Sequence, residues 1–218
     1  MTSYIDNYAT KSGGLINIHG IIPNTSVNFY AFITSFSDNM TSNWNEEQVY
    51  GRQDPIGTFQ NTTRKISLGF DLPASSLAEA KKNLTKVNQV KQFMYPAYHT
   101  SIAPPSGSTP TITRNALSLA KAPLVRLKFA NLIQNPNPSA ESSSVGLLGW
   151  IGSFSATPVI DMGMFNEGSQ EDGKFFPKVY NVSIDFTPQH EFDLGWNSGD
   201  GSAIDTTSFT KFPYDGGS

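Results

Sequence analysis

The sequence predicts a mainly β protein of the α+β class: a β-sandwich or curled antiparallel sheet with one flanking helix and long loops. Several segments alternate apolar and polar residues with a period of two, the pattern of a half-buried strand. Residues 76–94 instead show the three- and four-residue spacing of an amphipathic helix. Aromatic residues make up 12% of the 218-residue chain, so a large apolar core can form.

Strands are expected from residue 27 onward. The segment 27–34 is apolar at successive positions, which is typical of a single strand covered on both faces. Alternation is most regular in 62–72, and it recurs in 123–132 and 178–188. Glycines interrupt 145–165, which is expected to form one or two strands. The predicted inward residues are Ile66, Leu68, Phe70, Leu72, Val125, Leu127, Phe129, Tyr180, Val182, Ile184 and Phe186.

The helix has clear signals at both ends. Ser76 and Glu79 form a capping box, in which each side chain accepts a hydrogen bond from a free backbone N–H. The helix must end before Pro96, because proline lacks an N–H and disfavours a helical conformation in the preceding residue. Its apolar stripe is expected to pack on a sheet: Leu77, Ala80, Leu84, Val87, Val90, Phe93 and Met94.

Three regions lack periodicity: residues 36–61, 97–122 and 187–218. Long aperiodic segments inside a compact domain are usually functional loops or disordered. The last region is rich in Gly, Asp, Ser and Thr with scattered aromatic residues, and we expect it to dock as an arm. The predicted organisation is therefore one β domain over 1–186 and a C-terminal extension over 187–218.

The composition excludes several classes of function. Charged residues make up only 15% of the chain, against roughly 25% in an ordinary domain. Neighbouring subunits can cover such a surface without burying charge. The net charge of −3 offers no basic footprint for nucleic acid, and the absence of Cys excludes disulfides and thiolate sites. We also expect no membrane partner, because no secretory signal and no long apolar span are visible.

No catalytic motif is recognisable among the residues. His190, Glu191 and Asp193 include metal-ligand types, but two or three such residues in a polar tail are common by chance. The acidic run at 167–172 lacks the spacing of a calcium-binding loop and is expected to be solvated. The prediction is a non-enzymatic protein with no catalytic residue, no cofactor and no metal.

A polar turn precedes the most regular strand. Gly51 and the Asp54–Pro55 pair suit a tight turn, and Arg52 and Arg64 lie on either side of the strand's start. Either guanidinium has the fixed fork that ties a loop or a neighbouring chain to a sheet edge. The alternative is a surface ion pair of Arg52 with Asp54 or Glu47, which contributes under about 1 kcal/mol.

One stretch of the chain also resembles a known family. The order is FxxxFSDxxxSxW from Phe32 to Trp44, then VYGRQDPIGTFQNTTRKISLGFDLPA over 49–74, then MYPAY over 94–98. This order resembles that of the tail-tube initiator and baseplate-tube proteins of contractile-tailed bacteriophages and related contractile injection systems. The resemblance spans roughly residues 27–98, and it is a pattern of composition and order without a catalytic signature.

The resemblance implies a tail-tube-like fold and a structural role in the virion tail or baseplate, with synthesis in the host cytoplasm. A homohexameric ring would join the baseplate hub to the tail tube and template tube polymerisation. The implied partners are other copies of the chain, the hub and adjacent tube proteins, with tape-measure, sheath or wedge proteins as further candidates. The implied interface residues are Trp44, Tyr50, Arg52, Asp54, Pro55 and Arg64.

Two other classes of function stay open. A carbohydrate-binding β-sandwich would stack sugar rings on exposed aromatics such as Trp44, Trp150 and Trp196. A hydrolase of cell-wall glycan would need two neighbouring carboxylates, which the sequence cannot locate. Ring-shaped oligomers favour the structural class, glycan-dependent thermal stabilisation the second, and lysis of purified cell wall the third.

Overall fold

The computed structural model describes most of the chain and is built mainly from strands. The described residues are 15–103, 111–135, 146–167, 174–191, 193–202 and 213–214. Their strands are β1 (Leu15–Gly20), β2 (Thr25–Tyr30), β3 (Phe32–Glu47), β4 (Ile56–Pro73), β5 (Ala97–Ala103), β6 (Thr111–Lys121), β7 (Val125–Phe129), β8 (Leu147–Pro158), β9 (Met164–Glu167), β10 (Lys174–Pro177) and β11 (Val179–Pro188). Their helices are α2 (Leu77–Phe93) and the short 3-10 helix η1 (Ile160–Met162).

The body of the molecule is one curled antiparallel sheet. Its seven strands follow the order β2-β1-β7-β8-β11-β4-β3. The end strands β2 and β3 are separated in sequence by Ala31 alone, so the two ends of the sheet must approach each other. Phe29 of β2 accordingly contacts Phe70 of β4, with their ring centroids 5.5 Å apart. The predicted mainly β fold with a large antiparallel sheet is confirmed.

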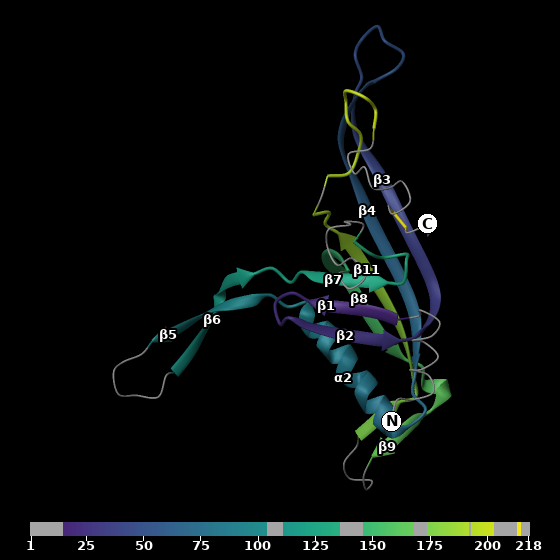
Figure 1. Cartoon of the computed structure of the whole chain (residues 1–218), viewed down its shortest axis with the longest axis vertical. Helices are drawn as coiled ribbons and strands as arrows, with labels where there is room; N and C mark the ends of the chain where they lie inside the picture. The colour runs from purple at the N-terminus through teal and green to yellow at the C-terminus, as the bar shows by residue number, and fades with distance from the viewer. Residues whose placement is uncertain are drawn as a thin grey trace.

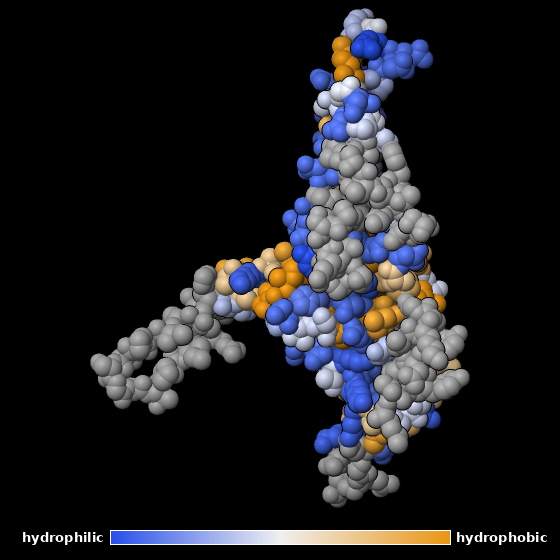
Figure 2. All heavy atoms as spheres, in the orientation of Figure 1, coloured by the Kyte–Doolittle hydropathy of each residue, from blue (hydrophilic) through white to orange (hydrophobic). Residues whose placement is uncertain are grey.

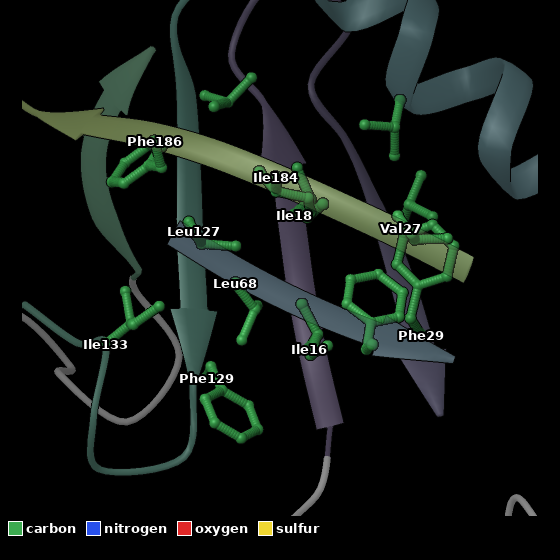
Figure 3. Packing of buried hydrophobic residues seen from close by; sticks show 14 of the residues in the cluster. Ile16, Ile18, Val27, Phe29, Leu68, Leu127, Phe129, Ile133, Ile184 and Phe186 are labelled. Carbon is green, nitrogen blue, oxygen red and sulfur yellow. The ribbon is translucent and has the colours of Figure 1, made fainter. Parts of the chain in front are cut away.

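The apolar core fills the space inside this curl. Figure 3 shows side chains of β1, β2, β4, β7 and β11 converging there. All the inward residues predicted for the three regular strands are buried. Fully burying a side chain such as Leu68 or Ile184 contributes roughly 1.5–3 kcal/mol, so this cluster is what fixes the curl.

The segment 27–34 is a correction to the sequence analysis, because it does not form one strand. It divides at Ala31 into the end of β2 and the beginning of β3. Val27 and Phe29 are buried from β2, whereas Ile33 of β3 lies opposite Phe70. The apolar residues at successive positions thus belong to two strands at opposite ends of the sheet.

The helix α2 begins and ends close to its predicted limits. The Ser76 hydroxyl accepts a hydrogen bond from the backbone N–H of Glu79 at 3.3 Å. The Glu79 carboxylate accepts from the backbone N–H and hydroxyl of Ser75, at 2.8 and 2.6 Å, instead of from Ser76. Val87 and Val90 are buried, and the helix contacts β1, β2, β9 and β10. Its apolar stripe therefore packs on sheet strands, as expected.

Two regions expected to be aperiodic are in fact hairpins. Most of 36–61 belongs to β3 and β4, with a turn at 48–55, and most of 97–122 belongs to β5 and β6. Figure 1 shows both hairpins projecting from the body in different directions. The side chains of residues 39–63 are exposed or half-buried on both faces, so no apolar alternation marks this hairpin.

The beginning of the predicted C-terminal extension is part of the sheet. The boundary proposed after residue 186 falls within β11, which ends at Pro188. The backbone N–H of Gln189 then donates to the carbonyl of Leu148 at 2.7 Å. Further along, the Tyr214 ring packs edge-on against Phe36, with centroids 6.3 Å apart. These described parts of the extension therefore contact their own chain.

Candidate functional site

The most prominent candidate surface is the outer part of the β3–β4 hairpin, Asn39–Lys65, which we call the long arm. Strand β4 pairs with β11 only over Ile66–Pro73, and β3 pairs with β4 alone. Both outer edges of the long arm therefore face no other strand within the described part of the chain (Figure 1). An isolated two-stranded hairpin is at best marginally stable in water. The long arm thus needs support at its base and a partner along its length.

That support is a buried ion pair at the base of the arm. The Nε of Arg64 donates to both carboxylate oxygens of Asp38 at 3.0 and 3.1 Å, and Nη2 donates to Oδ2 at 2.6 Å. The hydroxyl of Tyr214 donates to the same Oδ2 at 2.9 Å. The two charged side chains are only 4% and 2% exposed. Bidentate, desolvated contacts of this kind hold two strands in one geometry.

His190 lies in the electrostatic environment of this ion pair. Burial chiefly lowers the pKa of its imidazole, the Arg64 guanidinium lowers it further, and the Asp38 carboxylate partly offsets both effects. A neutral imidazole is therefore favoured beside the buried guanidinium. The residues Asp38, His190 and Tyr214 come from distant parts of the chain, and their sequence contains no signal that they meet Arg64.

The position of Arg64 follows from the alternation of β4. It lies on the face that continues inward to Ile66 and Leu68, and it is itself 6% exposed. The sequence placed Arg64 beside the turn as a residue that fixes the loop. The structure instead places it at the base of the arm, where it binds Asp38 of the adjacent strand β3.

Farther out, the long arm carries an exposed aromatic pair. Trp44 and Phe59 lie opposite each other across the two strands, and their rings meet edge to face with centroids 5.3 Å apart. The indole N–H of Trp44 donates to the Ser42 hydroxyl at 2.9 Å, and Gly57 leaves room beside the ring. Trp44 is nevertheless 56% exposed and Phe59 52% exposed. This pair presents a preformed apolar surface to a partner.

The turn at the tip of the arm presents its side chains to solvent. Gly51 has a φ of 85°, a conformation that favours glycine, and the N–H of Arg52 donates to the carbonyl of Val49 at 3.2 Å. Tyr50 is 105% exposed, so it does not anchor the loop within the chain. The alternative, an ion pair of Arg52 with Asp54 or Glu47, is not among the ion pairs of the described residues.

The strands of the long arm lack the usual protection of a sheet edge. Residues 40–45 and 56–63 contain no Asp, Glu, Lys or Arg. Natural proteins normally block exposed edges with charge, proline or bulges, because unpaired backbone groups recruit other strands. The long arm has a bulge near Trp44 but no charged residue in these runs. Its edges and its apolar face are therefore suited to contact with another chain.

Of the six residues predicted for an interface, five lie in the outer arm, and only Arg64 lies at its base. The sequence analysis missed Phe59, although it could have been found as an aromatic residue in an uncharged run after the turn. It also missed Asp38 and Tyr214, which only the folded chain brings to Arg64.

No other cluster suggests bound chemistry. Within the described residues, no group of three or more His, Asp or Glu side chains is placed to hold a metal ion. Glu191 instead binds Arg126, with two contacts of 2.7 Å, and the hydrogen bond from Arg126 is the main cause of its lowered pKa. No helix in this part of the chain is long and apolar enough to cross a membrane.

The sequence matches no protein-family model and no curated protein. Among solved structures, one that it resembles is the Dit (gp 19.1) protein of SPP1, described as a paradigm of the hub adsorption apparatus in Gram-positive infecting phages. The TM-score is 0.36 and the identity 5%, over 80% of this chain and 49% of that one, so the chain spans about half its length. Another is the 6-fold symmetrised baseplate of the anti-feeding prophage, with a TM-score of 0.28 and 7% identity over 79% of this chain and 87% of that one. Likenesses this weak carry no inference, and the proposals below rest on the residues of this chain.

Proposed function

We propose that the chain is a non-enzymatic structural protein of a phage tail, a ring-forming component of the tail tube or baseplate. In this role it joins the hub to the tail tube and templates tube polymerisation. The observation that carries the proposal is the long arm, because it combines uncharged runs, outer edges that pair with no other described strand and an exposed aromatic pair on a rigid base. Such a surface is suited to contact between chains in an assembly.

The position of the family resemblance supports this proposal. The resembling stretch, residues 27–98, contains most of β2 and all of β3, β4 and α2, which build the long arm and the body beneath it. Copies related by rotation bury large, non-identical surfaces against each other and close into a ring. A charged fraction of 15% lets those surfaces be covered with little desolvation of charge.

Two roles are assigned to the predicted interface residues in this proposal. Trp44, Tyr50, Arg52, Asp54 and Pro55 contact a partner from the outer arm. Arg64 is a positioning residue, because its bond to Asp38 sets the base from which the arm projects. The partners are other copies in a homohexameric ring, the hub and adjacent tube proteins, with tape-measure, sheath or wedge proteins as further candidates, all within the virion.

The test is electron microscopy of whole particles with antibody labelling of this chain. Label confined to the site where tail meets baseplate supports a ring that begins the tube. Label along the whole tail would instead make the chain the main tube subunit. Absence of label from every particle would overturn the structural proposal.

A carbohydrate-binding module is the second candidate, favoured by the exposure of all three tryptophans. Trp44, Trp150 and Trp196 are 56%, 44% and 63% exposed. Aromatic faces of this kind stack on sugar rings, so a ligand would raise the melting temperature of the isolated chain. A monomer that glycan fragments stabilise, and that no particle contains, would favour this candidate over the ring.

A further inference from the structure

A second projecting hairpin resembles the long arm in its isolation. Strands β5 and β6, Ala97–Lys121, form a two-stranded sheet of their own, and we call this hairpin the short arm. Figure 1 shows it leaving the body at a steep angle to the long arm. A two-stranded hairpin alone is marginally stable, so the short arm also needs a partner surface.

The short arm and the outer part of the long arm carry opposite charge. The short arm contains Arg114 and Lys121 and no acidic residue, a net charge of +2. The outer part of the long arm, residues 40–60, contains three acidic residues and one arginine, a net charge of −2. Opposite charges on two surfaces favour their encounter and disfavour contact between like arms.

The arms also share an apolar feature. Tyr98 and Leu119 lie opposite each other across the short arm and are 41% and 65% exposed. This pair is the counterpart of Trp44 and Phe59 on the long arm. Figure 2 shows hydrophobic surface where the short arm leaves the body and again near the tip of the long arm. Exposed apolar patches mark interaction sites when they are contiguous and have polar rims.

In each arm, charged residues follow a member of the apolar pair by two or three positions in the sequence. Lys121 follows Leu119 by two residues, while Glu46 and Glu47 follow Trp44 by two and three. Successive residues of a strand point to opposite faces, so one of the two carboxylates is available on either face of the long arm. A register shift between Ala97 and Tyr98 places Lys121 opposite Ala97, on the strand face away from Tyr98 and Leu119. The Lys121 ammonium therefore lies at the edge of the apolar contact, where a carboxylate of the long arm can approach it.

We propose that the long arm of one copy packs against the short arm of a neighbouring copy. The Trp44–Phe59 pair covers the Tyr98–Leu119 pair, and Glu46 or Glu47 approaches Lys121. The arms of one chain project in different directions, so the contact forms between copies (Figure 1). Each copy then donates one arm and receives another, which is the heterologous contact that closes rings. This inference rests on the proposed function and names the surfaces that join the ring.

The first test uses disulfide trapping, since the chain contains no cysteine of its own. Glu46→Cys and Ala120→Cys place single thiols at exposed positions beside the two contact pairs, and Glu46 lies on the same face of β3 as Trp44. We expect an intermolecular disulfide when the two variants are mixed in the assembled protein, and none in either variant alone. Lys82→Cys, at an exposed site on α2, is the matched control and should not cross-link with either variant.

Three results of the trapping experiment would overturn the proposal. A disulfide in the Glu46→Cys variant alone would mean that long arms pair with each other. A disulfide within one chain of the double variant would mean that both arms meet in a single copy. Assembly without any arm-to-arm disulfide would overturn the arm contact and leave the ring intact.

The second test is a charge-reversal cycle measured as the dissociation constant of the assembly by sedimentation. The double variant Glu46→Lys/Glu47→Lys should raise the dissociation constant about fivefold for each ion pair that is lost, and so should the single variant Lys121→Glu. Combining all three substitutions should restore much of the loss, whereas Lys82→Glu should change little. Additive losses without restoration would overturn the contact.

These experiments separate the inference from the function on which it rests. Antibody labelling of particles tests the ring without reference to the arms. A labelled particle whose arms fail both tests contradicts only the arm contact. A chain that is monomeric at every concentration and absent from particles contradicts both proposals.

Discussion

At the scale of single residues, two ion pairs of the described residues differ in their environment. The Arg64 and Asp38 side chains are almost completely buried, whereas those of Arg126 and Glu191 are 23% and 37% exposed. Removing one partner of a buried pair leaves an uncompensated charge in a poorly polar surrounding. An exposed pair loses little when broken, because water solvates the remaining charge.

Asp38→Asn should therefore lower the free energy of unfolding by about 3–5 kcal/mol, because it leaves the Arg64 guanidinium buried without its counter-charge. Glu191→Gln is the matched control at the exposed pair and should cost under about 1 kcal/mol. Urea denaturation of both variants measures the difference. Equal costs would show that the base of the long arm is not held by this pair.

His190 should make stability depend on pH. Its pKa is lowered in the folded chain, chiefly by burial, so the unfolded chain binds a proton first as the pH falls. The free energy of unfolding should then decrease as the pH falls below about 6.5, the ordinary histidine pKa. His190→Gln should remove much of this decrease. Melting temperatures between pH 7.5 and 5 check it, and an unchanged slope in the variant would assign the effect to other groups.

At the scale of elements, residues of the long arm are expected to stabilise assembly, whereas core residues of the sheet stabilise the fold. Trp44→Ala removes an edge-to-face contact worth about 0.5–1.5 kcal/mol and should leave folding almost intact. Phe70→Ala, in the core of β4, should cost about 3–5 kcal/mol. Chemical denaturation measures both costs, and sedimentation should show that Trp44→Ala is the more damaging to assembly. If Trp44→Ala lowered the free energy of unfolding as much as Phe70→Ala does, the result would contradict a role of Trp44 in binding.

The sequence located the elements that bury one face and missed those that bury none. The strands β4, β7 and β11 alternate because one side of each faces the core, and α2 carries both a cap and an apolar stripe. The outer long arm has no buried side, so its Asn-, Ser- and Thr-rich strands resemble loops in sequence. The break at Ala31 was missed because local pattern cannot distinguish one doubly covered strand from two strands.

At the scale of the whole molecule, the tip of the long arm should be the preferred site of proteolysis. Arg52 is exposed in a projecting turn, whereas Arg64 is buried. Trypsin should cleave after Arg52 in the free chain before it cleaves after Arg64, and assembly should slow that cut because a neighbour covers the arm. Mass spectrometry of timed digests measures the order. Equal rates in free and assembled protein would show that the tip stays uncovered.

The residues alone indicated a β-rich chain of low charge, a capped helix, three core strands and a polar turn whose Arg52 can bind a neighbouring chain. These features could be predicted because periodicity and helix capping involve residues that are close together in the sequence. The family resemblance indicated Trp44 as an interface residue. The curl of the sheet, the Asp38–Arg64–Tyr214 contact and the projection of the two arms became visible only in the folded molecule. Each of them joins or separates residues that are distant in the chain, and no local pattern encodes such distances.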